Sequence, residues 1–525
     1  MDGPQLCAAL RFHEVMPRTK LLLTLVLLST ATALGAPSRS PASTQQEAIF
    51  QDETQLEATP AATLDTLRDL GVTRVRVSLY WSRIAPRRDS RRRPPHFDAT
   101  NPSAYPRAGW QVYDEIVRDA ATRGVSAYFQ ITGTAPLWAT GAAPPAGGPY
   151  GQWRPSASEF RAFVTAVGRR YSGTYRGLPA VRFWSIWNEP NYGVDLAPQA
   201  THNDTVEVGA AQYRALLDAG WAGLHRSGHG RDTILFGEVA PHGLDHPIGN
   251  FSGVKPLRFL RALYCVDARL RPLRGYAAAL RSCPTAASGS RRFRSQHPAL
   301  FSASGFADHP YAQGLAPNRS LAPDPDYADL PEIPRLERTL DHLQRVYGSR
   351  ARLPIWNTEY GYWTNPPERV ARINPTTAAL YINWAEYLSW RQPRVRSYMQ
   401  YLLVDPARGN FASGLLFKNG RPKPPLRDAY RMPLYLPRPG GRRGRPLEVW
   451  GDVRPAHLAG AGQRVAIQWR PRSGRWQTVR LVGITNLRGY FDVRQAFRGS
   501  GGVRLVYSRP AGGTITSRTA TITLR

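Results

Sequence analysis

Eight short runs of apolar and β-branched residues recur between residues 47 and 430, and stretches with helical periodicity separate them. Apolar residues three positions apart, as in Leu64, Leu67 and Leu70, are typical of helices that cover one face of a sheet. The alternation predicts repeated βα units. Eight such units in about 380 residues favour a closed α/β barrel of the (β/α)8 TIM type, with long βα loops. An open doubly wound sheet is disfavoured, because no G-x-G-x-x-G follows the first run. The predicted strands are Ala48–Gln51, Val72–Tyr80, Val125–Thr132, Val181–Trp187, Thr233–Val239, Gly305–Tyr311, Leu353–Glu359 and Val395–Val404.

The residue pattern changes after a segment rich in Pro, Gly and Arg at 433–446. Beyond it apolar residues alternate with polar ones, as in Val503–Tyr507, and Gly-rich turns separate the runs. This pattern predicts a small all-β sandwich of immunoglobulin or fibronectin type. The expected segments are a signal peptide region (1–36), a catalytic barrel (37–432), a linker (433–446) and an accessory sandwich (447–525). Three tryptophans of the sandwich are expected in its core rather than on a sugar-binding surface: Trp450, Trp469 and Trp476.

The N-terminus has the order of features found in an export signal. Arg18 and Lys20 precede an apolar run, Leu21–Leu28, and the small residues Ala31–Ala33 follow it. The run is too short to span a membrane, and a short buried helix is the alternative. We therefore expect a secreted or cell-surface protein.

Cysteine usage agrees with export. Signal cleavage removes Cys7 and leaves Cys265 and Cys283, and an even pair in an exported chain suggests a disulfide. Two free thiols are the alternative. Neither C-x-x-C nor H-E-x-x-H occurs, so the sequence indicates no metal site and no cofactor.

The formal net charge is +31, but only four of the 69 basic residues are lysine, and the arginines are scattered along the chain. This distribution fits an arginine codon bias in a GC-rich, bacterial genome and a protein with a basic surface. Such a charge can attract anionic cell-wall polymers. No P-loop or RRM-like aromatic pair is present, so a nucleic-acid partner is not expected.

Two glutamates close two of the predicted strands. Glu189 follows the fourth strand and Glu359 the seventh. The working residues of (β/α)8 enzymes lie at the carboxyl ends of strands, and these two strands lie on opposite sides of the barrel, so the two side chains can converge across its mouth. Carboxyl groups about 5–5.5 Å apart suit a retaining glycosidase. One of them must act as an ionised nucleophile and the other as a proton donor.

The segment Trp187–Pro190 (Trp-Asn-Glu-Pro) resembles the strand-four motif of clan A glycoside hydrolases, which include families 5 and 39. The resemblance implies that Glu189 is the acid/base and Glu359 the nucleophile. It also implies that Asn188 binds the sugar 2-hydroxyl. An isolated Asn-Glu-Pro, by contrast, is usually a helix or turn boundary.

Two further motifs carry the same resemblance. His309 and Tyr311 match the clan's His-x-Tyr, whose side chains order the carboxylates, and Arg76 matches the strand-two arginine that keeps the nucleophile ionised. The alternatives are ordinary polar groups at a strand end and, for Arg76, a structural ion pair.

The chain also departs from the clan pattern. Gln130–Gly133 lacks the strand-three histidine that is common in family 5, and Tyr398–Tyr401 lacks the usual strand-eight tryptophan. Glu238 closes the fifth strand as an additional carboxylate, for which a structural role is expected. Trp138 and Trp363 lie near strand ends and are expected to support substrate binding, because aromatic rings there can stack on sugars. Packing of the barrel rim is the alternative for each.

The predicted function is hydrolysis of a β-type glycosidic bond in a carbohydrate substrate by a monomeric, cofactor-free enzyme. A transglycosylase with the same residues is one alternative. A catalytically inactive polysaccharide-binding protein is another, and a nucleic-acid binder, suggested by charge alone, is the third.

Overall fold

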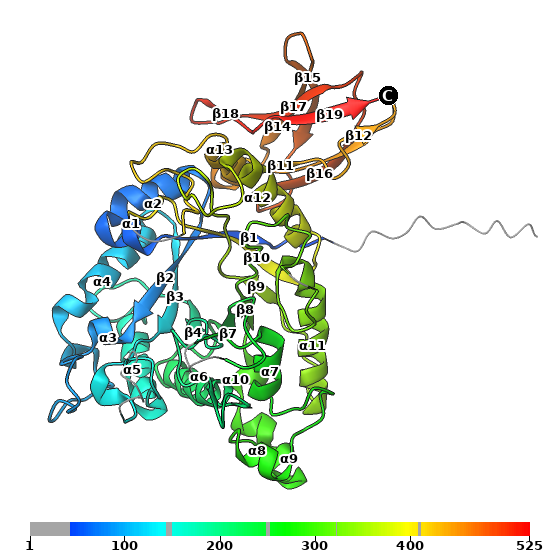
Figure 1. Cartoon of the computed structure of the whole chain (residues 1–525). Coiled ribbons are helices and arrows are strands. Elements are labelled where there is room, and N and C mark those ends of the chain that lie inside the picture. The colour runs from blue at the N-terminus through cyan, green and yellow to red at the C-terminus, as the bar shows by residue number, and fades with distance from the viewer. Residues whose placement is uncertain (1–41, 143–149, 248–251, 322, 408–410) are drawn as a thin grey trace, which may run out of the picture. The chain divides into compact units, whose positions relative to one another are not determined.

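The computed structural model describes residues 42–142, 150–247, 252–321, 323–407 and 411–525. Eight parallel strands close into a barrel in the order β1-β10-β9-β8-β7-β4-β3-β2 (Figure 1). The predicted (β/α)8 architecture is therefore confirmed, including its first strand. The barrel strands are β1 (Glu47–Gln51), β2 (Arg74–Tyr80), β3 (Ser126–Thr132), β4 (Phe183–Ile186), β7 (Thr233–Val239), β8 (Gly305–Asp308), β9 (Ile355–Asn357) and β10 (Val395–Tyr401).

Helices follow the barrel strands and surround them (Figure 1). Their apolar faces form one continuous core with the outward-facing residues of the strands. A short pair, β5 (Ala200–Thr201) and β6 (Val206–Glu207), lies in the loop after β4. The helices are α1 (Glu53–Ala58), α2 (Pro60–Asp69), α3 (Trp81–Ile84), α4 (Arg107–Thr122), α5 (Ala157–Arg170), α6 (Gly209–Arg226), α7 (Pro256–Leu263), α8 (Gly275–Ala279), α9 (Ala287–Gln296), α10 (Ala299–Ser302), α11 (Ile333–Val346), α12 (Pro375–Trp390) and α13 (Leu426–Arg431).

The interior of the barrel changes from apolar to polar along its axis. A separate apolar cluster that includes Ile49, Phe183, Leu235 and Met399 fills part of it. Polar and charged side chains come from the carboxyl ends of the strands, as expected for this fold. The chemistry of the barrel is thus concentrated at one end.

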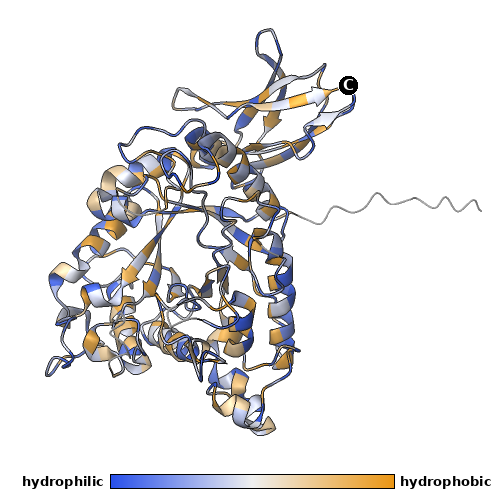
Figure 2. Ribbon diagram, in the orientation of Figure 1, coloured by the Kyte–Doolittle hydropathy of each residue, from blue (hydrophilic) through white to orange (hydrophobic). Residues whose placement is uncertain are grey.

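The C-terminal residues form two mainly antiparallel sheets whose facing side chains share one apolar core, which confirms the predicted all-β sandwich. Hydrophobic and hydrophilic residues alternate along these strands (Figure 2), as expected when one face of each sheet is buried. The strands are β11 (Leu434–Tyr435), β12 (Gly440–Gly441), β13 (Leu447–Asp452), β14 (Arg464–Pro471), β15 (Gln477–Gly483), β16 (Tyr490–Gln495), β17 (Gly501–Ser508), β18 (Thr514–Thr516) and β19 (Ala520–Leu524).

Two details of the sandwich differ from the sequence-based expectation. The segment 433–446, expected as a linker, contributes β11 and β12, which pair with β13 and β19. Trp469 is buried in the sandwich core, but Trp450 is buried against α12 instead and Trp476 is partly exposed, so the expected core position is wrong for these two. Trp476 precedes β15 in a hairpin and therefore escapes the alternation that buries Trp469.

A buried ion pair joins the sandwich to the helical layer. Arg454 lies 2.8 Å from a carboxylate oxygen of Glu386 on α12, and both side chains are 1% exposed. The Tyr490 hydroxyl donates to the same carboxylate at 2.8 Å, and Asp452 lies 3.3 Å from Arg454. The pair therefore fixes the sandwich to α12 by charge as well as by apolar contact.

The predicted disulfide is present between Cys265 and Cys283, whose Cα atoms are 5.6 Å apart. Among the described residues, no helix is both long and apolar enough to cross a membrane. The predicted signal peptide, residues 1–36, lies outside the described residues.

The Arg454→Ala variant should be destabilised by about 3–5 kcal/mol, because Glu386 and Asp452 would stay buried without their cation. Urea unfolding of wild type and variant measures the difference. Arg494→Ala removes an ion pair whose arginine is 58% exposed, and should change stability by about 0.5 kcal/mol or less. Equal effects of the two substitutions would contradict this reading of the contact.

Candidate active site

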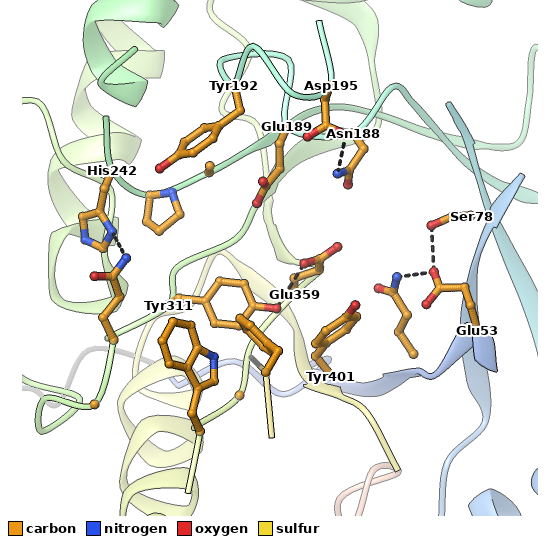
Figure 3. A pocket seen from close by; sticks show the side chains of 18 of the residues that line it. Glu53, Ser78, Asn188, Glu189, Tyr192, Asp195, His242, Tyr311, Glu359 and Tyr401 are labelled. Atoms are coloured by element: carbon orange, nitrogen blue, oxygen red, sulfur yellow. Dashed lines mark hydrogen bonds between the residues drawn. The ribbon is translucent and has the colours of Figure 1, made fainter. Parts of the chain in front are cut away.

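A cavity of about 500 Å³ opens at the carboxyl ends of the barrel strands, and both predicted glutamates line it (Figure 3). Glu189 follows β4 and Glu359 follows β9. One carboxylate oxygen of each and a ring nitrogen of His309 all lie within 4.8 Å of one another. This short separation of the two carboxyl groups fits a retaining glycosidase. In inverting enzymes the two groups are about 6.5–9.5 Å apart.

Glu359 is bound on both carboxylate oxygens. Arg76 donates to Oε1 at 2.7 Å and the Tyr311 hydroxyl donates to Oε2 at 3.0 Å. The Glu359 side chain is 13% exposed, so it keeps an open side towards the cavity. A cation and a hydroxyl on a nearly buried carboxylate stabilise its negative form, which suits a nucleophile.

Glu189 has a different environment. His309 Nδ1 lies 2.9 Å from its Oε1, and the side chain is 22% exposed. The backbone of Glu189 has a φ of 32°, a left-handed conformation that is rare for a non-glycine residue and is found preferentially at functional sites. The chain turns sharply here and presents the carboxyl group to the cavity.

Beneath the two glutamates lies Glu238, which is fully buried. Its Oε2 accepts from Arg76 at 3.0 Å, from His309 Nε2 at 2.7 Å and from Thr358 at 2.7 Å, and its Oε1 accepts from the Tyr128 hydroxyl. Burial alone would raise the pKa of Glu238, but the charge of Arg76 and the hydrogen bond from His309 hold it well below its usual range. Glu238 is thus a permanent buried anion.

A local irregularity aims Glu238 inward. The pairing of β7 with β8 shifts register between Gly237 and Val239, and Gly237 and Glu238 have φ values of 112° and 50°. Leu235 faces the barrel interior and Phe236 the helical layer, so strict alternation would turn Glu238 outward. The bulge reverses this and points the carboxylate into the barrel.

His309 connects the three carboxylates. Burial alone would lower its pKa, but the charge of Glu359 and the hydrogen bonds with Glu189 and Glu238 raise the pKa to about 10. The ring is therefore protonated at neutral pH. Glu189, His309 and Glu359 have the spacing of potential metal ligands, but both ring nitrogens of His309 are already hydrogen-bonded, to Glu189 and to Glu238.

Two hydrogen bonds to its oxygen orient the side-chain amide of Asn188. Its Oδ1 accepts from Gln130 Nε2 at 2.8 Å and from Arg76 at 3.2 Å. With the oxygen held in this way, the amide nitrogen points away from Arg76, where it donates to Asp195 at 3.4 Å. Asn188 and Asp195 both line the cavity, so the amide can act as a hydrogen-bond donor to a ligand.

The two predicted aromatic residues take different positions. Trp363 lines the cavity and packs its ring against Phe411 at 4.9 Å. The structure does not bring Trp138 to the cavity: its ring packs against Trp81 and Phe97, and its indole nitrogen donates to the carbonyl of Pro86. Trp138 therefore packs the rim of the barrel, the alternative noted from the sequence.

The cavity also contains groups that the sequence did not single out. Glu53, two residues after the end of β1, accepts from Ser78 at 2.8 Å and from Gln51, and burial raises the pKa of Glu53. Asp195 has a pKa raised well above its usual value by burial and by the charge of Glu189. Glu53 could have been predicted as a cavity residue, because it follows the end of a strand. Asp195 lies further along a loop, and no feature of the sequence indicates its position.

No protein-family model and no curated protein matches the chain. Among solved structures, it is similar to a family 39 glycoside hydrolase from Bacteroides cellulosilyticus WH2 (15% identity, 87% of this chain and 79% of that one, TM-score 0.46). It is also similar to a GH39 enzyme from Xanthomonas axonopodis pv. citri (13% identity, 87% of this chain and 93% of that one, TM-score 0.46). A third similar structure is GH5_18 from Streptomyces cattleya in complex with GlcNAc (15% identity, 74% of this chain and 79% of that one, TM-score 0.44). Identity this low leaves function to be inferred from the cavity's own side chains.

Protonation of His309 should make folding stability depend on pH. Its pKa rises from 6.5 to about 10 on folding, so its contribution is complete below about pH 6.5 and is lost as pH rises through about 10. We expect the free energy of unfolding of the wild type to fall more steeply between about pH 7 and 10 than that of His309→Gln. Denaturant unfolding across this range measures both slopes. His96→Gln, at an exposed histidine, should behave as wild type, and a wild-type slope in His309→Gln would contradict the assignment.

Proposed function

We propose that this chain is a retaining glycoside hydrolase that cleaves a β-type glycosidic bond through an ester on Glu359. The observation that carries the proposal is the pair of cavity carboxylates within 4.8 Å whose partners differ in kind. Glu359 accepts from the cation of Arg76 and from Tyr311, and Glu189 is held by His309 alone among these groups.

Each glutamate acts in both steps. In the first, a carboxylate oxygen of Glu359 bonds to the anomeric carbon as the bond to the leaving oxygen breaks, and Glu189 gives its proton to that oxygen. In the second, Glu189 takes a proton from water, whose oxygen bonds to the anomeric carbon and releases Glu359. The proton returns to Glu189, so the enzyme is regenerated without a cofactor.

The same side chains support a role in sugar binding. Asn188 lines the cavity, and its amide nitrogen donates to Asp195 there; in a complex the same nitrogen can donate to a hydroxyl next to the reacting carbon. Trp363 offers part of its ring to the cavity, and aromatic faces bind the apolar faces of sugar rings. The proposed substrate is accordingly a poly- or oligosaccharide.

We also propose that the protein acts outside the cytoplasm, as a monomer. A disulfide between Cys265 and Cys283 suits an oxidising compartment, and the sequence of residues 18–36 resembles an export signal. A net charge of +31 would attract the exported protein to anionic cell-wall polymers.

The Glu359→Ala variant should lose at least about 10³-fold in kcat on the substrate that the wild type cleaves, because no ester can form. Product release from a panel of β-linked polysaccharides and aryl glycosides, followed by chromatography, measures this. Glu57→Gln changes a surface carboxylate that pairs with Arg83 and should leave kcat unchanged. Equal activity of Glu359→Ala and wild type would refute the assignment. If the wild type hydrolysed no substrate of the panel, a polysaccharide-binding protein would be favoured instead.

The Glu189→Ala variant should show a dependence on the leaving group. Hydrolysis of an alkyl glycoside needs a proton on the departing oxygen and should slow by about 10²–10⁴-fold. A 2,4-dinitrophenyl glycoside needs none in its first step, so the variant should release a burst of dinitrophenolate and then turn over slowly. Stopped-flow absorbance resolves the two phases. If the first step slowed equally for both substrates, Glu189 would not be the acid.

A further inference from the structure

Trp476 lies between two arginines on the six-stranded sheet of the sandwich. The guanidinium carbon of Arg470 is 4.8 Å from the ring centroid and that of Arg504 is 4.2 Å from it. Arg470 belongs to β14 and Arg504 to its antiparallel neighbour β17. We call Arg470, Trp476 and Arg504 the arginine–tryptophan patch.

The register of the sheet places this patch on the outer face. Gln468 pairs with Arg504, and Arg470 pairs with Gly502, whereas the alternate residues of both strands, among them Trp469 and Leu505, are buried in the sandwich core. A Cβ atom at Gly502 would lie 3.2 Å from the Trp476 ring. The glycine therefore leaves room for the indole to lie across β17, between the two guanidinium groups.

Two like charges held this close repel each other. Arg504 donates its Nε to Gln468 at 3.0 Å, a neutral partner that does not offset the guanidinium charge. Burial, together with the charge of Arg470, lowers the pKa of Arg504. An anion bound between the guanidinium groups would relieve this repulsion.

The surroundings extend the positive charge. Residues 433–525 contain 17 arginines, no lysine and three acidic residues, Glu448, Asp452 and Asp492. Arg472 and Arg475 are exposed in the hairpin that carries Trp476. The described lining of the barrel cavity differs from this surface, since it includes Glu53, Glu189, Asp195 and Glu359 but neither lysine nor arginine.

We propose that the arginine–tryptophan patch is a binding site for an anionic polysaccharide, whose carboxylate or other acidic groups bind the two guanidinium groups. The indole ring lies against both guanidinium groups and restrains them, and a planar guanidinium binds a carboxylate through two parallel hydrogen bonds. The exposed hairpin arginines would contact further acidic groups along the same polymer. This site is separate from the catalytic cavity and does not depend on the proposed hydrolase activity.

Affinity electrophoresis of the purified chain through gels containing polygalacturonate, with dextran as the neutral polymer, tests the site. Arg470→Ala/Arg504→Ala should weaken polygalacturonate binding about tenfold or more. Arg442→Ala/Arg443→Ala removes the same charge from exposed arginines next to β12, at the other edge of the same sheet, and should weaken binding about twofold or less. Trp476→Ala keeps the charge but releases the guanidinium groups, and should weaken binding several-fold. Melting temperatures verify that each variant is folded.

Equal weakening by the two double variants would overturn the proposal, because binding would then follow net charge alone. Unchanged binding by Arg470→Ala/Arg504→Ala would overturn it as well. Duplex DNA added as competitor separates polysaccharide from nucleic acid: if DNA displaced polygalacturonate at equal phosphate and carboxylate concentrations and bound through the same patch, the assignment to a polysaccharide would be wrong. Each patch variant should cleave a small aryl glycoside as the wild type does, so failure of the patch and failure of the hydrolase assignment are distinguishable.

Discussion

A buried cluster of charges beneath the cavity determines the properties of the active site. Arg76, Glu238 and His309 are fully buried, and Glu238 accepts hydrogen bonds from both of the others. A buried cation is costly unless an anion with good geometry compensates it. Glu238 supplies that anion for two cations at once, so Arg76 and His309 each keep a further hydrogen bond for the glutamates of the cavity.

This arrangement gives the two glutamate side chains of the cavity, Glu189 and Glu359, different electrostatic surroundings. Arg76 cannot lose its proton under ordinary conditions, so Glu359 always has a cation at 2.7 Å, as a nucleophile requires. Glu189 has no contact with Arg76 and depends on His309, 2.9 Å away. His309 also lies 3.7 Å from Glu359, so its positive charge is shared between the two glutamates. The assignment of roles therefore follows from how the cations are distributed rather than from which strand each glutamate closes.

Much of this arrangement could be predicted from sequence, and the failures have identifiable causes. The βα alternation predicted the barrel, the strand-end rule predicted Glu189 and Glu359, and the family resemblance added His309 and Tyr311; the structure brings these four side chains together. Glu238 could be recognised as a carboxylate at a strand end, but not as a partner of Arg76, because a bulge in β7 reverses the direction of its side chain. Trp138 was misplaced for the opposite reason: proximity to a strand end says nothing about the direction of a ring that fills the rim.

The separation of charge within the chain has a further consequence for catalysis. The described lining of the cavity contains carboxyl groups and neither lysine nor arginine, whereas the sandwich contains 17 arginines against three acidic residues. The proposed arginine–tryptophan patch would hold an anionic polymer at the sandwich, and a neutral glycan could enter the cavity without competing for that patch. If the two kinds of glycan occur in one wall or matrix, binding of the first raises the effective concentration of the second near Glu189 and Glu359, without any additional contact at the cavity. This gain would apply to a polymeric matrix and would be absent for a small soluble glycoside, because the patch does not hold such a substrate near the cavity. It would also weaken steeply with added salt, as attraction to a polyanion does.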